Sequence, residues 1–170
     1  MTASNPGSLS HVAADGSARM VDVGDKPETD RMARVTGSIR MQRGTLEAIV
    51  ANTLRKGDVL AVARLAGIMG AKRTAELIPL CHPLALTDIQ VEVVPDAALP
   101  GVRVEAVARA HGRTGVEMEA FTAAGVALLT IYDMAKAMDR AMVIGELSLA
   151  EKTGGAGGAY ARLDGTDSAI

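Results

Sequence analysis

From Ala120 to Tyr132 the chain carries no charged side chain, and apolar residues occupy nearly every side of the helix that this stretch can form. A helix that is apolar nearly all round has to be buried on most of its faces. Thr114 and Glu117 have the spacing of a capping box, which predicts a helix over about 115–138. The rest of the chain must therefore supply layers that cover this helix.

A second apolar helix is predicted over 59–77, after a shorter helix at about 45–54. Asp58 stands where its side chain can cap the N-terminus of the longer one. Gly67 and Gly70 lie in the interior of this helix, where they permit either close packing against a neighbour or a bend.

Alternating apolar and polar side chains predict four strands, of which the middle two form an antiparallel hairpin. The strands span about 33–41, 89–94, 102–108 and 143–149. The order along the chain is then strand, two helices, strand, strand, long helix, strand. Apart from one added helix, this is the β-α-β-β-α-β order of the ferredoxin-like fold, so we predict an α+β subunit with an antiparallel sheet.

The length of 170 residues fits one folded domain. Residues 1–19 are rich in Ser, Gly and Ala, and 153–170 contain a glycine-rich stretch, so both segments are predicted to be flexible. A single packed domain is expected to span 20–152.

The overall charge and the cysteine usage exclude several classes of protein. A net charge of −2 and an aromatic content of 2% disfavour a nucleic-acid-binding protein, which needs clustered cations and stacking surfaces. Cys81 is the single cysteine, so no intramolecular disulfide can form, which suits a reducing compartment. No signal sequence or membrane span is expected, because charges or helix breakers interrupt the apolar stretches. We therefore predict a cytoplasmic protein.

The apolar residues are mostly small aliphatic ones, which bury little area each. Burial of further surface between subunits would help to stabilise such a core. We therefore expect a homo-oligomer.

Asp133 and Lys136 interrupt the apolar helix and lie on one of its faces. They form either an ordinary ion pair near the helix end or a partly desolvated pair whose pKa values suit proton transfer. Glu119 precedes Asp133 by fourteen residues, which places it ~21 Å away along the helix axis. If both residues serve one reaction, the site has to be built between subunits.

Lys56 precedes Gly57 and a helix start, where a lysine and backbone amides can together bind a phosphate. A solvated lysine in a turn is the alternative interpretation.

Pro79 and Pro83 make the segment between them a stiff, extended loop that carries Cys81 and His82. Both side chains can bind zinc, but adjacent ligands are a poor start for a tetrahedral site, and the other two histidines show no matching spacing. We therefore predict no metal site. A loop that presents His82 to a substrate is favoured over a packed structural histidine.

Several segments together resemble the molybdenum cofactor biosynthesis protein C family, the cyclic pyranopterin monophosphate synthases. The resemblance runs in family order from about residue 20 to 155. The matching segments are Met20–Val23, Lys56–Val59, Ala71–Thr74, Leu77–Leu84 (L-I-P-L-C-H-P-L), Thr114–Ala120 (T-G-V-E-M-E-A) and Thr130–Met134.

The resemblance implies a lyase that converts (8S)-3′,8-cyclo-7,8-dihydroguanosine 5′-triphosphate to cyclic pyranopterin monophosphate and diphosphate, with no cofactor. It also implies a hexamer built as a trimer of dimers, with active sites at dimer interfaces. The implied catalytic residues are Asp133, Lys136 and Lys56. The implied substrate-binding residues are Leu80, Cys81, His82, Met118, Glu119, Asp22, Arg31 and Lys152.

Two features qualify these expectations. The glycine-rich segment carries Ala156 where family members commonly have a basic residue. The ferredoxin-like fold also serves many functions, so a non-catalytic module that binds a nucleotide and regulates a partner is the alternative function.

Overall fold

The computed structural model describes residues 16–162, and its strands form one antiparallel sheet in the order β2-β3-β1-β4-β5. The first four strands along the chain, together with the helices between them, follow the predicted β-α-β-β-α-β order. The predicted fold class is therefore confirmed. The strands are β1 (Thr29–Arg40), β2 (Leu86–Asp96), β3 (Gly101–Gly112), β4 (Val143–Thr153) and β5 (Tyr160–Ala161). Residues 1–15 and 163–170 lie outside the described part, so the predicted flexibility of the two ends stays a prediction.

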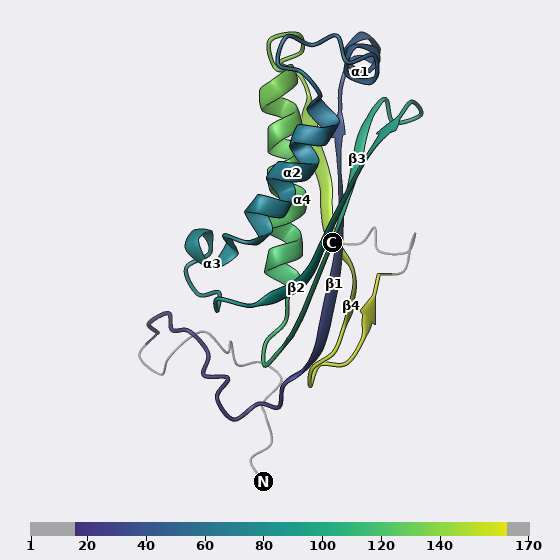
Figure 1. Ribbon diagram of the computed structural model, residues 1–170. Helices are drawn as coiled ribbons and strands as arrows, with labels where there is room; N and C mark the ends of the chain where they lie inside the picture. Colours follow the sequence, from purple (N-terminus) through teal and green to yellow (C-terminus); the bar gives the residue numbers. More distant parts are fainter. Residues whose placement is uncertain (1–15, 163–170) are drawn as a thin grey trace.

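Two long helices cover one face of this sheet and leave the other face open (Figure 1). They run antiparallel to each other and pack along most of their length. The helices are α1 (Arg43–Val50), α2 (Val59–Ala71), α3 (Thr74–Leu77) and α4 (Glu117–Ala135). The strand residues that face the helices are apolar and fully buried, among them Ala33, Val35, Ile39, Val102 and Val104.

The predicted helix over 59–77 is divided into α2 and α3. Asp58 caps α2 as expected, because its carboxylate accepts a hydrogen bond of 2.9 Å from the Ala61 N–H. At the other end, the Thr74 hydroxyl donates to the Ala71 carbonyl at 3.0 Å. In a continuous helix, this carbonyl would accept a hydrogen bond from the backbone N–H four residues later. The Thr74 hydroxyl bonds to it here, and α2 ends.

The predicted capping box at the start of α4 is wrong. Val116 occupies the N-cap position, and no side chain caps this helix. The Glu117 carboxylate instead accepts a hydrogen bond of 3.0 Å from the Lys152 ammonium. The contact with β4 thus takes the carboxylate away from the local backbone, a competition that spacing alone does not reveal.

By length and composition alone, α4 is apolar enough to cross a membrane, but half of its apolar stretch is buried inside the fold. α2 approaches it closely at two glycines. A Cβ at Gly67 would lie 2.8 Å from the Ala123 carbonyl oxygen, and one at Gly70 would lie 2.9 Å from Val126. Of the two roles predicted for these glycines, the structure therefore shows close packing.

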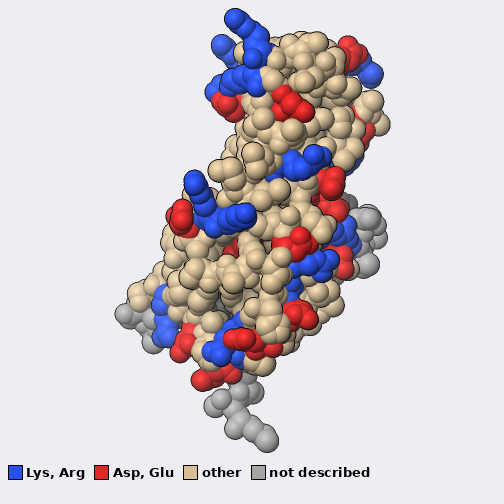
Figure 2. All heavy atoms as spheres, viewed as in Figure 1, with Lys and Arg blue, Asp and Glu red and all other residues tan. Residues whose placement is uncertain are grey.

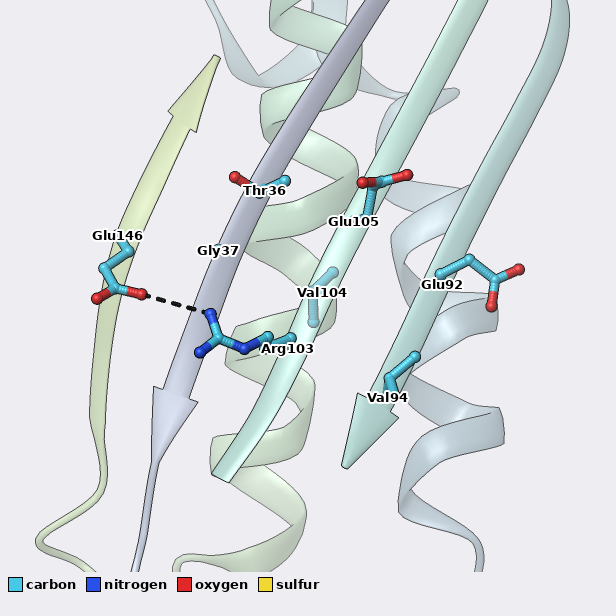
Figure 3. Close-up of a pocket in the computed structure, with 8 residues that line it drawn as sticks. All are labelled: Thr36, Gly37, Glu92, Val94, Arg103, Val104, Glu105 and Glu146. Carbon is cyan, nitrogen blue, oxygen red and sulfur yellow. Dashed lines mark ion pairs between the residues drawn. The ribbon is translucent and has the colours of Figure 1, made fainter. Parts of the chain in front are cut away.

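The open face of the sheet carries charged side chains in place of a helical cover (Figure 3). Arg103 lies between Asp96, at 2.6 Å, and Glu146, at 4.0 Å. Glu92 and Glu105 stand opposite each other in the β2–β3 register beside the same cavity of about 250 Å³. None of the predicted site residues lines this cavity.

The glycine contact between α2 and α4 predicts the effect of Gly67→Ala. Alanine favours a helix by ~1 kcal/mol over glycine, yet its Cβ would push α2 away from α4. We expect a net loss of about 1–3 kcal/mol in the free energy of unfolding, measured by urea titration at one protein concentration. Gly44→Ala in α1 is the control, since a Cβ there meets nothing within 4 Å. Equal stability of Gly67→Ala and the wild type would contradict the packing argument.

Candidate active site

The predicted site residues form two groups at opposite ends of α4. Met118 and Glu119 lie in its first turn, and Asp133 lies in its last. Since a helix rises about 1.5 Å per residue, the fourteen residue steps from Glu119 to Asp133 correspond to ~21 Å. One chain therefore does not bring the two groups together.

The first group lines a cavity of about 270 Å³ beside the N-terminal end of α4. The double-proline loop forms one wall of this cavity and the first turn of α4 forms another. Predicted binding residues in the lining are Leu80, Cys81, His82, Met118 and Glu119. Asp22 does not line it. Its carboxylate accepts a hydrogen bond of 2.8 Å from the Gly24 N–H, while its neighbours Val21 and Val23 reach the cavity.

Glu119 is 4% exposed, and none of the other described residues donates a side-chain hydrogen bond to its carboxylate. Burial raises its pKa, and the negative charge of Glu117 adds to that effect. The pKa of the Cys81 thiol is raised as well, first by burial and then by the charge of Glu119. The immediate surroundings of Glu119 and Cys81 therefore disfavour negative charge and are suited to neutral hydrogen-bonding groups.

A second cavity, of about 180 Å³, adjoins the first and carries four cations in its lining, Lys26, Arg31, Arg113 and Lys152. Lys152 pairs with Glu117 at 3.0 Å, and Arg113 lies 3.4 Å from Glu28. Lys26 and Arg31 have no carboxylate partner within the described chain. The cavity is therefore suited to bind an anion.

Lys26 lines both cavities, although sequence reasoning did not single it out. It lies in an irregular segment in which its N–H bonds to the Val23 carbonyl at 3.1 Å. Such a segment has no periodicity that predicts where a side chain points. The cations of the second cavity come from distant parts of the sequence, and only the fold brings them together.

At the other end of α4, Asp133 accepts hydrogen bonds from two lysines. One carboxylate oxygen lies 2.7 Å from the Lys136 ammonium, and the other lies 2.8 Å from that of Lys56. Lys56 also donates to the Asp133 backbone carbonyl at 2.9 Å. The predicted ion pair of Asp133 and Lys136 is thus confirmed, and Lys56 joins it.

In the single chain the Asp133 side chain is 58% exposed, so the alternative, a partly desolvated pair, stays a prediction for the assembled protein. Hydrogen bonds from Lys136 and Lys56 lower the pKa of Asp133 to about 2. The same contact raises the pKa of Lys136. Because the folded pKa of Asp133 lies below its ordinary value of 3.8, the ion pairs stabilise the fold above that pH, and this stabilisation is lost as the pH falls through about 2.

Within residues 16–162, no group of three or more His, Cys, Asp and Glu side chains is arranged to hold a metal ion. Figure 2 shows Lys and Arg side chains grouped at the upper end of the molecule, where α4 ends. The two ends of α4 therefore differ in character. One carries a buried carboxylate beside two cavities, and the other carries an exposed cationic cluster.

Comparison with known proteins gives consistent matches over this whole region. A sequence profile of the MoaC family matches residues 20–155. A cyclic pyranopterin monophosphate synthase from Brucella ovis is 58% identical over 158 residues, which cover 93% of this chain and 96% of that protein. A synthase of the same name from Dinoroseobacter shibae is 59% identical over 152 residues, which cover 89% and 96% respectively.

The coupling between Glu119 and Cys81 predicts a shift in thiol reactivity. Glu119→Gln removes the negative charge that helps to raise the pKa of Cys81, so alkylation should become faster at a given pH. Because Cys81 is the single cysteine, the pH profile of iodoacetamide modification reports on this thiol alone. Glu47→Gln is the control, because Glu47 is exposed in α1, at the opposite end of the molecule from the Cys81 loop (Figure 1). An unchanged profile in Glu119→Gln would show that burial alone sets this pKa.

Proposed function

This chain belongs to the MoaC family, and on that basis we propose how its residues carry out the reaction of a cyclic pyranopterin monophosphate synthase. The reaction is a lyase step in molybdenum cofactor biosynthesis. Its substrate is (8S)-3′,8-cyclo-7,8-dihydroguanosine 5′-triphosphate, and its products are cyclic pyranopterin monophosphate and diphosphate. The observation that carries the proposal is the pair of adjoining cavities at one end of α4, one lined by Glu119, Cys81 and His82 and the other by four cations.

The triphosphate occupies the cationic cavity in this proposal. Lys26 and Arg31 have no carboxylate partner in the described chain, so a phosphate can bind them without breaking an ion pair. Lys152 and Arg113 add positive charge to the same lining. The charge of these side chains supports placing the triphosphate here. Ala156 lines the same cavity without contributing the cation that family members commonly have at this position.

The ring system occupies the adjoining cavity. A purine-derived ring carries amide and amine groups, which form hydrogen bonds with a carboxyl group and an imidazole. Glu119 and His82 line this cavity, together with the apolar side chains of Leu80 and Met118. The shared residue Lys26 lies where the two parts of one substrate would join.

Ring rearrangement requires proton transfers, and we assign these to Asp133 and Lys136, with Lys56 near the phosphates. Closure of the cyclic phosphate forms a bond from a sugar hydroxyl oxygen to the α-phosphorus and breaks the bond from that phosphorus to diphosphate. Negative charge then develops on the leaving oxygens, where a lysine stabilises it. A second subunit that covers Asp133 would desolvate it and raise its pKa toward the range of a useful base.

The substrate then lies between two subunits, because one chain separates the two groups by ~21 Å. A stripe of residues with heptad spacing runs along α4 to its C-cap and supports this arrangement. It comprises Met118, Thr122, Gly125, Leu129, Tyr132 and Lys136. Its centre is apolar or small, and Leu129 is 61% exposed.

Antiparallel pairing of this stripe with that of a second copy brings the separated groups together. Glu119 and Asp133 lie equally far from residue 126, so a twofold axis there places Glu119 beside the partner's Asp133. Each dimer then holds two equivalent sites. We further propose the hexamer, a trimer of such dimers, as the complete assembly, and the cytoplasm as its location.

Asp133→Asn tests the assignment of the proton-transfer group. The variant keeps the shape of the side chain but removes its charge and basic oxygen. Folded, oligomeric Asp133→Asn should bind the cyclic triphosphate and convert it at least ~10²-fold more slowly in single-turnover experiments. Light scattering checks the assembly. Near-normal conversion would leave Asp133 with only a structural ion pair.

A mixing experiment tests whether two subunits share one site. Glu119→Gln and Asp133→Asn should each be at least ~10²-fold slower than the wild type as pure proteins. Unfolding and refolding them together at equal amounts should restore about a quarter of wild-type activity, since half of random dimers are mixed and each mixed dimer has one intact site. Two pure variants refolded separately and then combined are the control. No recovery of activity in mixed dimers would contradict the shared site. Glu119 and Asp133 would then act within the same chain, or one of them would lie outside the active site.

A further inference from the structure

The connection from β4 to β5 carries two glycines in the left-handed region, Gly154 with φ of +89° and Gly155 with φ of +80°. The Gly155 carbonyl accepts a hydrogen bond of 3.1 Å from the Gly158 N–H, which closes a tight turn. Beyond the turn, Tyr160 pairs with Lys152 across the β4–β5 ladder. The glycine turn is therefore held at both ends by strands.

The backbone of this connection lies against the side chain of Arg31. A Cβ at Gly155 would overlap the Arg31 Nη1 atom and would lie 2.9 Å from its Cζ. A Cβ at Gly154 would instead overlap the backbone carbonyl of Asp30. Gly154 thus packs on the main chain of β1, whereas Gly155 packs on the guanidinium group itself.

Arg31 is held by backbone groups and not by an acid. Its Nε donates to the Gly112 carbonyl at 3.2 Å, and no carboxylate lies within ion-pair distance in residues 16–162. The guanidinium thus stays near the cavity that Lys26 and Lys152 also line, with its charge available to an anion. A planar guanidinium that is already oriented loses less conformational freedom when it binds a phosphate.

We propose that Gly155 is a positioning residue that orients the Arg31 guanidinium for phosphate groups of the substrate. Only a residue without a Cβ lets the loop backbone lie against Nη1 at this place. The proposal rests on the proposed function for the identity of the ligand, but the contact itself is independent of turnover.

Binding of inorganic pyrophosphate to the assembled protein, measured by titration calorimetry, tests this role. Gly155→Ala should displace the guanidinium and weaken binding about tenfold, the effect of losing one charge-assisted hydrogen bond. Gly158→Ala is the matched control. Its φ of +69° imposes the same kind of backbone strain, but a Cβ there meets nothing within 4 Å. We expect wild-type affinity for Gly158→Ala.

A double-mutant cycle shows whether Gly155 acts through Arg31. Arg31→Ala should also weaken binding, and Gly155→Ala should then have no further effect in the Arg31→Ala background. An equal additional loss in that background would overturn the proposal. So would wild-type affinity of Gly155→Ala, or an equal loss in Gly158→Ala, which would point to loop strain alone.

Arg31→Lys tests the same contact without changing the glycine turn, in case Gly155→Ala does not fold. It keeps the charge but removes the planar group that Gly155 orients, so binding should weaken severalfold. Wild-type affinity of Arg31→Lys, or no pyrophosphate binding by the wild type, would overturn the proposal. Failure of the wild type to convert the cyclic triphosphate would refute the proposed function while leaving a pyrophosphate-binding Gly155–Arg31 contact intact.

Discussion

The close packing of α4 between the sheet and α2 is the constraint on which the rest of the structure depends. The helix can lie this near its neighbours because small residues line the contact. Gly67 meets the Ala123 carbonyl, Gly70 meets Val126, and Gly37 of β1 leaves room for Leu128. A rigid helix held in this way separates its two ends by a distance that no side chain can span.

The two separated ends of α4 have different electrostatic properties. At one end, Glu119 is buried beside Cys81, and burial raises the pKa of both groups. At the other end, Asp133 stays in water and is held ionised by two lysines. A second copy related by a twofold axis would place these complementary ends together, and the same contact would cover the exposed Leu129.

The order of the strands along the chain and both long helices could be predicted from hydrophobic periodicity. Burial of one face makes apolar residues recur every two residues in a strand and every 3.6 residues in a helix. Local patterns also identified the Asp58 cap and the ion pair of Asp133 and Lys136. They failed for Glu117, which has capping-box spacing but bonds to Lys152 in β4. Strand pairing brought a lysine thirty-five positions away within reach of this carboxylate, and local spacing carries no information about such a partner.

The sequence by itself determined the fold class and the family, because hydrophobic periodicity and long contiguous segments such as Leu77–Leu84 are properties of neighbouring residues. The tertiary structure alone decided which cations share a cavity, since Lys26, Arg31, Arg113 and Lys152 meet only after the strands pair. It also decided that Asp133 is exposed and that Gly155 lies against Arg31. Exposure and contact depend on what the rest of the chain places nearby in space, which order along the sequence does not specify.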